Sequence, residues 1–445
     1  MSTRPRSPGS LSRRRFLKVS ATAMAAAPVL GPRILLGRPL ESLNVACIGV
    51  GGMGFSDLEQ VASATNVRII ALCDVDAANL ARAAEHSPEA RQFSDYRLLL
   101  DALDRDLDAV TISTPDHMHG SIALAALRRG KHVYCQKPIA HNLHECRLMT
   151  EVAHEQGLVT QMGTQIHSHE AYRTAMAGLR SGVIGKVSEA HLWVSKSWAG
   201  PAGGRPDKAD PVPKQLDWDL WLGVASERPF VQGLYHPAFW RGWLDFGSGT
   251  LGDMGCHIFS PVFGALDLGP PRTVVSRGPA HGRETFAADG DILYEFEGTE
   301  WTTERLTLRW TDGNGPSRPD ASRAQLPKDE QLPDAGSFLV GEQGVLVIPH
   351  WSMPKLYRNG QALDAKLEEL PGKNHYHEWA DACRGEGRTS CPFSFAGPLT
   401  EAVLLGTVAG RFQNQTLRFD AAKLKIDHAP AEALVRRRYR KGWEL

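Results

Sequence analysis

The hydrophobic and polar positions of the chain follow two different patterns after residue 40. In the first pattern, the short and mainly apolar runs "LNVACI", "VRIIALC", "LDAVTIS" and "KHVYC" alternate with helix-compatible stretches between residues 43 and 135. Strands that are apolar on both faces and alternate with helices are typical of a parallel sheet covered by helices on both sides. We therefore expect a doubly wound α/β domain over residues 41–164.

The second pattern covers residues 165–445 and favours an antiparallel sheet. The stretches "GKVSEAHLWVSK", "GDILYEFEG", "ERLTLRW" and "GVLVIPH" are longer and alternate between apolar and polar residues. One buried face and one solvated face give this alternation. Two polar loops, rich in proline and glycine, are expected at residues 200–214 and 311–336. This half should be an α/β domain with a large, mostly antiparallel open sheet.

Residues 1–40 differ from the rest and are left out of the fold. The stretch "SRRRFLK" at residues 12–18 precedes the mild apolar segment "VSATAMAAAPVLG". This arrangement resembles a twin-arginine signal, with small residues for cleavage near Ala25 to Ala27. It implies export to the periplasm or another extracytoplasmic compartment; the alternative is a disordered basic tail.

Composition excludes several classes of protein. Lys+Arg and Asp+Glu are balanced at 50 each, and no basic face stands out, so we expect no nucleic-acid partner. No run approaches the roughly 20 apolar residues that a membrane span needs. The seven cysteines are an odd number, and Cys47, Cys73 and Cys135 lie within apolar runs, so we expect buried thiols and no disulfide framework.

A glycine motif joins the first apolar run to the first helix. Gly49-x-Gly51-x-x-Gly54 would give a tight turn, room for a pyrophosphate and close packing of the helix, whose N-terminus faces the phosphates. Asp74 ends the second strand 20 residues after Gly54, where a ribose diol finds its acceptor. A carboxylate repels a 2′-phosphate and no arginine follows it, so NAD is favoured over NADP; capping of the next helix is the alternative for Asp74.

Other residues of the expected cofactor site follow the remaining strands. Ligands of doubly wound sheets lie across the carboxyl ends of the strands, so Thr114, Pro115 and Lys137 should face one crevice. Pro138 would hold Lys137 there, with a cis peptide as one option. The candidate cofactor-binding residues are Gly49, Gly51, Gly52, Met53, Gly54, Asp74, Thr114, Pro115, His119, Gln136, Lys137 and Gln165.

A predicted helix within "FGSGTLGDMGCHIFSPVFGALDLG" carries Asp253 and His257 four residues apart, on one face. A carboxylate that orients an imidazole makes a general-base pair, and Lys137 from the other domain would complete the site. An ordinary helical ion pair is the alternative. Histidine pairs such as "DHMH" and "HYHE" lack zinc-site spacing, so no metal is expected.

The aromatic stretch "YHPAFWRGWLDFG" precedes this helix. Sugar rings pack on aromatic side chains and hydrogen-bond to polar ones, so the candidate substrate contacts are His167, Tyr235, Trp240 and Arg241. The tryptophans could equally belong to the core. Farther along, "NHYHEWADACRG" is amphipathic, and Trp379 and Cys383 should pack inward.

The glycine motif, "STPDHMH", "CQKP" and "GDMGCH" occur in the order typical of the glucose-fructose oxidoreductase and inositol dehydrogenase (Gfo/Idh/MocA) family, which the chain resembles over nearly its whole mature length. The resemblance implies a Rossmann NAD-binding domain followed by an α/β substrate domain. It also implies a homo-oligomer formed through the second domain's sheet. The usual tripeptide is Glu-Lys-Pro, whereas Gln136 stands here before Lys137.

The resulting functional hypothesis is NAD-dependent hydride transfer at a hydroxyl of a sugar, glycoside or polyol. In it His257 removes the hydroxyl proton, Asp253 holds His257, and Lys137 donates to the developing oxygen charge. Export would require the cofactor to stay bound. Two alternatives remain: a redox-neutral NAD-dependent glycosidase, of which the family has examples, and a non-catalytic NAD- or sugar-binding protein.

Overall fold

The computed structural model describes residues 41–444 except 314–318, 320, 329 and 364–366. The described residues belong to one compact unit. The predicted twin-arginine signal at residues 1–40 lies outside the described residues, as does part of the second polar loop.

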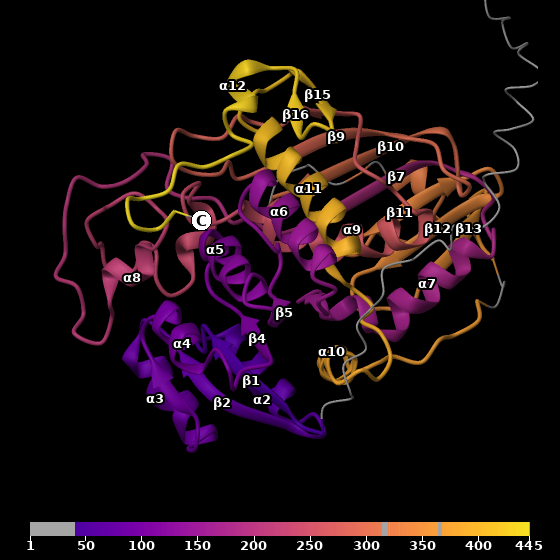
Figure 1. Ribbon diagram of the computed structural model, residues 1–445. Helices are drawn as coiled ribbons and strands as arrows, with labels where there is room; N and C mark the ends of the chain where they lie inside the picture. Colours follow the sequence, from indigo (N-terminus) through magenta and orange to yellow (C-terminus); the bar gives the residue numbers. More distant parts are fainter. Residues whose placement is uncertain (1–40, 314–318, 320, 329, 364–366, 445) are drawn as a thin grey trace, which may run out of the picture. The chain divides into compact units, whose positions relative to one another are not determined.

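The first sheet has six parallel strands in the order β3-β2-β1-β4-β5-β6 (Figure 1). Helices connect successive strands, which confirms the predicted Rossmann-like domain. Its elements are β1 (Leu43–Ile48), α2 (Met53–Ala62), β2 (Val67–Cys73), α3 (Ala77–His86), β3 (Arg91–Phe93), α4 (Tyr96–Leu103), β4 (Ala109–Ile112), α5 (Asp116–Leu127), β5 (His132–Cys135), α6 (Leu143–Glu155) and β6 (Thr160–Met162).

The second sheet has ten strands in the order β14-β13-β12-β11-β7-β10-β9-β8-β15-β16. Only β7 and β10 pair in parallel among these neighbours, so the predicted antiparallel character is confirmed. The strands are β7 (Val187–Val194), β8 (Thr273–Ser276), β9 (Gly290–Glu297), β10 (Thr302–Asp312), β11 (Ala335–Gly341), β12 (Gly344–Pro349), β13 (Lys355–Arg358), β14 (Gln361–Ala362), β15 (Thr416–Asp420) and β16 (Lys425–Ile426).

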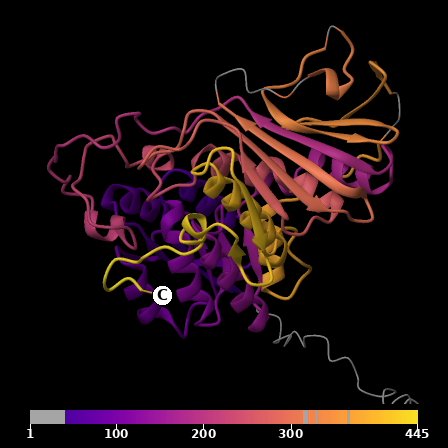
Figure 2. The ribbon, with the colours of Figure 1, turned by 90° about the horizontal axis from the view of Figure 1, so that it is seen from above.

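Helices α7 and α9 cover one face of the ten-stranded sheet (Figure 2). Phe259 and Phe263 of α9 pack against the inward aromatic residues of β9, Tyr294 and Phe296. The helices of this half are η1 (Gln165–Ser168), α7 (Glu170–Arg180), α8 (Trp218–Leu222), η2 (Phe239–Gly242), α9 (Gly249–Leu266), η3 (Ala321–Ala324), α10 (His375–Cys383), α11 (Phe393–Ala409) and α12 (Ala429–Glu432).

Two of these late helices return to the first sheet. Helix α10 packs against α2, and α11 packs against both α6 and α9 (Figure 1). Trp379 and Cys383 of α10 are buried in one apolar cluster with Leu58 and Val61 of α2. Their inward packing is confirmed, and the surface that they cover belongs to the nucleotide-binding fold.

All seven cysteines are buried and unpaired, as the sequence predicts. Burial raises the pKa of the Cys47 thiol to about 12, so this thiol is protonated and unreactive near neutral pH. Within the described part of the chain, the helices are too short or too polar to cross a bilayer.

Candidate functional site

A cavity of about 580 Å³ runs along the carboxyl ends of the strands of the first sheet and reaches α9. Its wall includes the glycine loop after β1, Asp74 after β2, Thr114 and Pro115 after β4, and Lys137 after β5. Asp253, Met254 and His257 of α9 line its other side. The cavity thus joins the predicted cofactor residues to the predicted catalytic residues.

The glycine loop has the geometry that a dinucleotide requires. Gly49 has φ +79°, and a Cβ on Gly54 would lie 1.9 Å from the Gly49 carbonyl oxygen, so both positions exclude larger residues. Gly51, Gly52 and Met53 line the cavity at the start of α2, whose first turn has no side-chain cap. The N–H groups of Gly54 and Phe55 donate to the Gly51 and Gly52 oxygens within this turn, and the positive end of the helix dipole faces the cavity, where it favours an anionic pyrophosphate.

Asp74 lies at the cavity wall beside this loop. Its carboxylate accepts the backbone N–H groups of Val50 and Asp76, both at 2.9 Å. Burial raises the pKa of Asp74, and these hydrogen bonds oppose the rise. Its place at the end of β2 fits the acceptor of a ribose diol.

The other cofactor candidates also lie around the cavity. Thr114, Pro115, His119 and Gln165 line it, whereas Gly54 packs behind the loop. The two ring nitrogens of His119 lie 2.7 Å from the Pro138 oxygen and 2.8 Å from the Thr114 oxygen. His119 therefore ties two loops of the wall together through its ring nitrogens.

Lys137 reaches from the first sheet to α9. The Lys137-Pro138 peptide is cis, and Lys137 Nζ donates to Asp253 Oδ1 and to the Asp253 backbone oxygen, both at 2.8 Å. Lys196 Nζ and Trp198 Nε1 each donate to Asp253 Oδ2 at 2.7 Å, and Arg241 Nε lies 3.4 Å from Oδ1. Burial alone would raise the pKa of Asp253, but Lys137, Lys196 and Arg241 hold it well below its usual range.

The expected pairing of Asp253 with His257 is wrong. Among the described residues the Asp253 carboxylate is bonded to cations and an indole, and His257 Nδ1 is buried without a hydrogen-bond partner. The helix places both side chains on one face, but the lysines compete successfully for the carboxylate. Burial, with further contributions from Lys137 and His350, lowers the pKa of His257 well below its ordinary value. A neutral imidazole in the cavity wall can accept a proton.

Gln136 also lines the cavity, and its side-chain amide binds Asp57 of α2. Gln136 Nε2 lies 3.0 and 2.9 Å from the two Asp57 carboxylate oxygens, which also accept from Ser113 Oγ at 2.6 Å and Tyr376 Oη at 2.7 Å. Asp57 is fully buried. Burial raises the pKa of Asp57, and its three hydrogen-bond donors and Lys137 oppose the rise.

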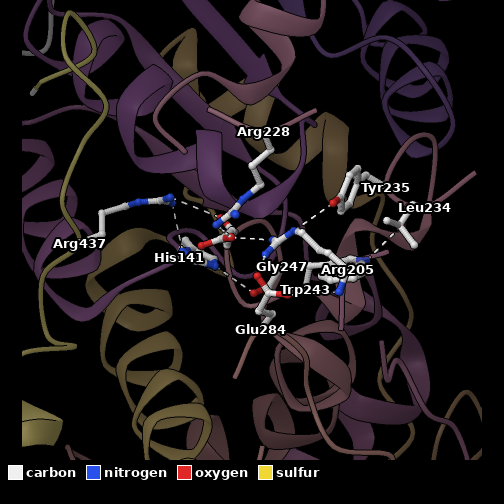
Figure 3. Close-up of polar contacts among 10 residues, drawn as sticks. His141, Arg205, Arg228, Leu234, Tyr235, Trp243, Gly247, Glu284 and Arg437 are labelled. Atoms are coloured by element: carbon white, nitrogen blue, oxygen red, sulfur yellow. Dashed lines mark hydrogen bonds and ion pairs between the residues drawn. The ribbon is translucent and has the colours of Figure 1, made fainter. Parts of the chain in front are cut away.

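Two of the four predicted substrate contacts line the cavity and two do not. Trp240 and Arg241 are at the wall, with the guanidinium 4.2 Å from the indole ring centre. Tyr235 is a correction: it is 1% exposed within an aromatic cluster, and its Oη accepts from Arg205 Nε at 2.9 Å (Figure 3). His167 does not line the cavity either, because it is buried in the core, where its Nδ1 lies 2.6 Å from Ser260 Oγ.

Charged residues fix the segment that leads into α9. Arg205 and Arg228 both pair with the Asp245 carboxylate, and Arg437 donates to the Asp245 backbone oxygen (Figure 3). Arg205 also pairs with Glu284. This network holds the loop before α9, and with it the wall that carries Asp253.

Several residues at the site escaped prediction. Lys196 lies two residues after the end of β7, and its sequence context is typical of a solvated strand end. The alternation in "HLWVSKSW" nevertheless places Lys196 on the same face as Leu192 and Val194. Asp116 follows Pro115 and lines the cavity; burial raises its pKa, opposed by His119, Arg241 and Lys137. Trp443 lines the cavity from the carboxyl-terminal part of the chain, 4.1 Å from the Arg97 guanidinium.

No group of three histidine, cysteine, aspartate or glutamate side chains is arranged to hold a metal ion within the described ranges. The polar groups of the cavity are instead those of a dinucleotide site: a helix N-terminus after the glycine loop, an acid after β2 and a lysine after β5.

Comparison with known proteins agrees with this geometry. Residues 43–164 match the Gfo/Idh/MocA oxidoreductase family with its NAD-binding Rossmann fold, and residues 184–284 match that family's C-terminal α/β domain. Together the two matches cover half of the chain.

The individual proteins with similar sequences match only part of this chain, at 30% identity or less. A "Glycosyl hydrolase family 109 protein 1" of Shewanella sp. (strain ANA-3) is 30% identical over 38% of this chain and 39% of that protein. A levoglucosan dehydrogenase of Pseudarthrobacter phenanthrenivorans is 28% identical over 49% of this chain and 50% of that protein. The chain thus spans half or less of the length of these curated relatives.

Solved structures share the fold over more of the chain. The WlbA dehydrogenase of Bordetella pertussis, in complex with NADH and UDP-GlcNAcA, has a TM-score of 0.60 and 15% identity, over 85% of this chain and 99% of that one. An aldose-aldose oxidoreductase of Caulobacter crescentus has a TM-score of 0.58 and 16% identity, over 85% and 100%. At this identity the likeness shows the fold alone. With both sheets, the glycine loop and the two sequence matches in agreement, the chain belongs to the Gfo/Idh/MocA family of oxidoreductases.

Proposed function

We propose that this protein is an NAD-dependent oxidoreductase that acts on a hydroxyl group of a sugar, glycoside or polyol. The observation that carries the proposal is the ion pair of Lys137 with Asp253, 2.8 Å long, in the cavity that also holds the glycine loop and His257. The dehydrogenases among the relatives support the chemical class. The nicotinamide, when bound, supplies the hydride acceptor.

We assign the other steps of the reaction to Lys137, Asp253 and His257. Two N–H groups of Lys137 are used by Asp253, and the third is available to the reacting oxygen of the substrate. Asp253 fixes the direction of Lys137, since its carboxylate and its backbone oxygen both accept from the same ammonium group. His257, kept neutral by burial, takes the hydroxyl proton.

We propose NAD rather than NADP as the cofactor. Asp74 and Asp95 both line the cavity after neighbouring strands, β2 and β3. Arg97 pairs with Asp95, so the choice rests on Asp74, whose carboxyl group disfavours the additional phosphate of NADP. A markedly tighter binding of NADP than of NAD by the purified protein would contradict this choice.

We also propose export by the twin-arginine route, on the evidence of "SRRRFLK" in residues 1–40. A cofactor carried out of the cytoplasm has no free pool for its recycling. The cofactor would stay bound through a closed cycle, in which the oxidation of one substrate is coupled to the reduction of another.

A redox-neutral glycosidase is the second candidate. The specific observation in its favour is the similarity to proteins named glycosyl hydrolase family 109 and to an α-N-acetylgalactosaminidase of Shewanella oneidensis, 29% identical over 38% of this chain. Such an enzyme would release free sugar with no net oxidation.

The test replaces Lys137 with alanine. We expect turnover to fall about 10²- to 10³-fold, because the donor to the reacting oxygen is lost, with NAD affinity nearly unchanged. Turnover is followed with a panel of sugars and glycosides, and the bound nucleotide is released and identified. Lys186→Ala, at an exposed lysine away from the cavity, is the matched control.

The products separate the candidate functions. Keto-sugar formation together with a reduced nucleotide supports the dehydrogenase, and free sugar without net reduction supports the glycosidase. A fully active Lys137→Ala variant would exclude the proposed role of Lys137. NAD binding without turnover of any substrate in the panel would identify a binding protein.

A further inference from the structure

The charged residues of the cavity are sorted along the edge of the first sheet. Asp95 and Asp74 follow β3 and β2, whereas Lys137 follows β5, at the opposite side of β1 and β4. Lys196 and Arg241 join Lys137 around Asp253. The cavity therefore has an acidic end beside the expected ribose site and a basic end beside α9.

The basic end carries more positive than negative charge. Lys137, Lys196 and Arg241 share one carboxylate, that of Asp253. Asp116 is the other acid at this end, and burial raises its pKa, which weakens it as a counter-charge. Three cations held around one carboxylate in a partly desolvated wall are stabilised by a further anion.

Lys196 and Arg241 also keep hydrogen-bond donors free. Within the described residues, Lys196 Nζ has one hydrogen-bond partner, Asp253 Oδ2, and the Lys196 side chain is 41% exposed. Arg241 Nη1 donates to the Ala238 oxygen and Nε lies 3.4 Å from Asp253 Oδ1, whereas Nη2 has no hydrogen-bond partner in the part of the chain that the structure describes. The Trp198 ring lies 5.0 Å from Lys196 Nζ and 5.3 Å from the Arg241 guanidinium, and so orients both.

The cofactor's own phosphates do not account for this excess of positive charge. The pyrophosphate site is at the glycine loop after β1, and two strand positions separate β1 from β5 in the sheet. The unused donors of Lys196 and Arg241 lie at the α9 side of the cavity, with Trp240 next to them. An anion bound there belongs to the substrate.

We propose that the substrate is an acidic sugar, and that its carboxylate binds between Lys196 and Arg241 while its reacting hydroxyl faces Lys137 and His257. The guanidinium fork of Arg241 matches the two oxygens of a carboxylate. This inference rests on the proposed oxidoreductase function and adds the substrate class. It identifies Lys196 and Arg241 as specificity residues.

The experiment compares matched acidic and neutral sugars on the NAD-loaded protein. Hexuronates and the corresponding hexoses of the gluco, galacto and manno series are measured at equal ionic strength, by calorimetric binding and by the second-order rate constant for reduction of the bound NAD in a single turnover. We expect at least one hexuronate to exceed its hexose by about tenfold or more. Lys196→Met and Arg241→Met should each reduce that acid-to-neutral ratio about tenfold, with NAD affinity unchanged.

The ratio is taken within each variant, so a partly unfolded preparation does not distort it. Lys208→Met is the matched control, since Lys208 lies on the exposed loop after β7 and pairs with Asp210. Lys196→Arg, which keeps the charge, should retain most of the preference. Hexose 6-phosphates form a further arm, and a stronger preference for them than for hexuronates would overturn the carboxylate assignment.

The outcomes distinguish this inference from the function on which it rests. Turnover of neutral hexoses with no acid preference overturns the acidic-substrate inference and leaves the oxidoreductase intact. Hexuronate binding that depends on Lys196 and Arg241, without NADH formation, supports the acidic site and contradicts the dehydrogenase. An unchanged ratio in both methionine variants, or no binding of any hexuronate, overturns the inference.

Discussion

Gln136 is the residue at which this chain departs from the Glu-Lys-Pro tripeptide of its family, and its contacts give the reason. The carboxylate of Asp57 is buried beneath it and accepts from the Gln136 amide, from Ser113 and from Tyr376. A glutamate at position 136 would place a second carboxylate against Asp57 in the core. An acidic group near Lys137 is therefore kept, but it is carried by α2.

Gln136→Glu should lower the free energy of unfolding by about 1–3 kcal/mol at neutral pH, because it replaces a buried hydrogen bond with repulsion between two acids. The shared proton raises the pKa of the pair above its unfolded value, so the destabilisation should vanish at low pH and grow as the pH rises. Urea unfolding over a pH series measures it.

Asp57→Asn provides the matched control for this prediction. In the Gln136→Glu background it restores a donor and an acceptor, so the double variant should recover most of the lost stability. A Gln136→Glu variant as stable as the natural chain at neutral pH would show that Asp57 is already neutral.

As the proposed general base, His257 should set the acid side of the pH profile. Burial and the neighbouring Lys137 keep its pKa well below the ordinary value of 6.5, so the imidazole stays unprotonated as the pH falls through that value. The kcat/KM should be level from about pH 8 to below pH 6.5 and decline only at lower pH. An acid limb centred at or above pH 6.5 would contradict this, and His257→Asn should abolish the limb along with most of the activity.

Residue chemistry was predictable from the sequence where the backbone dictates position. Lys137 is placed by the end of β5 and its proline, and Asp253 by the spacing along a helix. The prediction that Tyr235 and His167 contact the substrate was wrong. The sequence does not show whether the polar group of an aromatic side chain binds a ligand or another residue, which here is Arg205 for Tyr235 and Ser260 for His167. Lys196 was missed because its partner, Asp253, lies 57 residues away in the chain.

At the scale of elements, the parallel, doubly wound character of the first sheet followed from apolar runs, glycine and helices in alternation. The two edge strands, β3 and β6, were not among the four predicted strands. The four predicted strands of the second half correspond to β7, β9, β10 and β12. The placement of α10 did not follow, since its amphipathic pattern shows that one face is buried and says nothing of the surface that covers it. That surface is α2, and Tyr376 of α10 donates directly to Asp57 there.

The segment between β7 and α9 shows the same limit. Its glycine and proline content predicted a loop at residues 200–214. The arginine and carboxylate pairs that hold this part of the chain join residues far apart in the sequence: Arg205 and Glu284 are 79 positions apart, and Arg440 and Asp219 are 221 apart. Such pairs depend on the final fold, so local sequence patterns do not reveal them.

On the scale of the whole molecule, the cavity is assembled from distant parts of the chain. Trp443 is 7% exposed and lines the cavity together with Tyr96 and Trp221. Arg440 fixes this last segment by donating to the Gly223 backbone oxygen at 3.0 Å and pairing with Asp219. The wall of the cofactor site near β3 therefore includes the carboxyl-terminal segment.

Trp443→Ala should speed the loss of bound NAD about tenfold, because an aromatic wall of the cavity is removed. The measurement is the nucleotide that remains with the protein after timed gel filtration, which needs no substrate. Leu98→Ala, at a 61% exposed position on α4, is the control and should release NAD at the natural rate. Equal rates for both variants would show that Trp443 does not retain the nucleotide.

The position of Trp443 also bears on how the protein is made. The six strands of the nucleotide-binding sheet have all been translated by residue 162, yet a side chain that completes their cavity comes 281 residues later. A nascent chain that ends within the second sheet would present an open, incomplete site. Stable capture of the nucleotide should therefore wait until residue 443 has been synthesised and both sheets have folded.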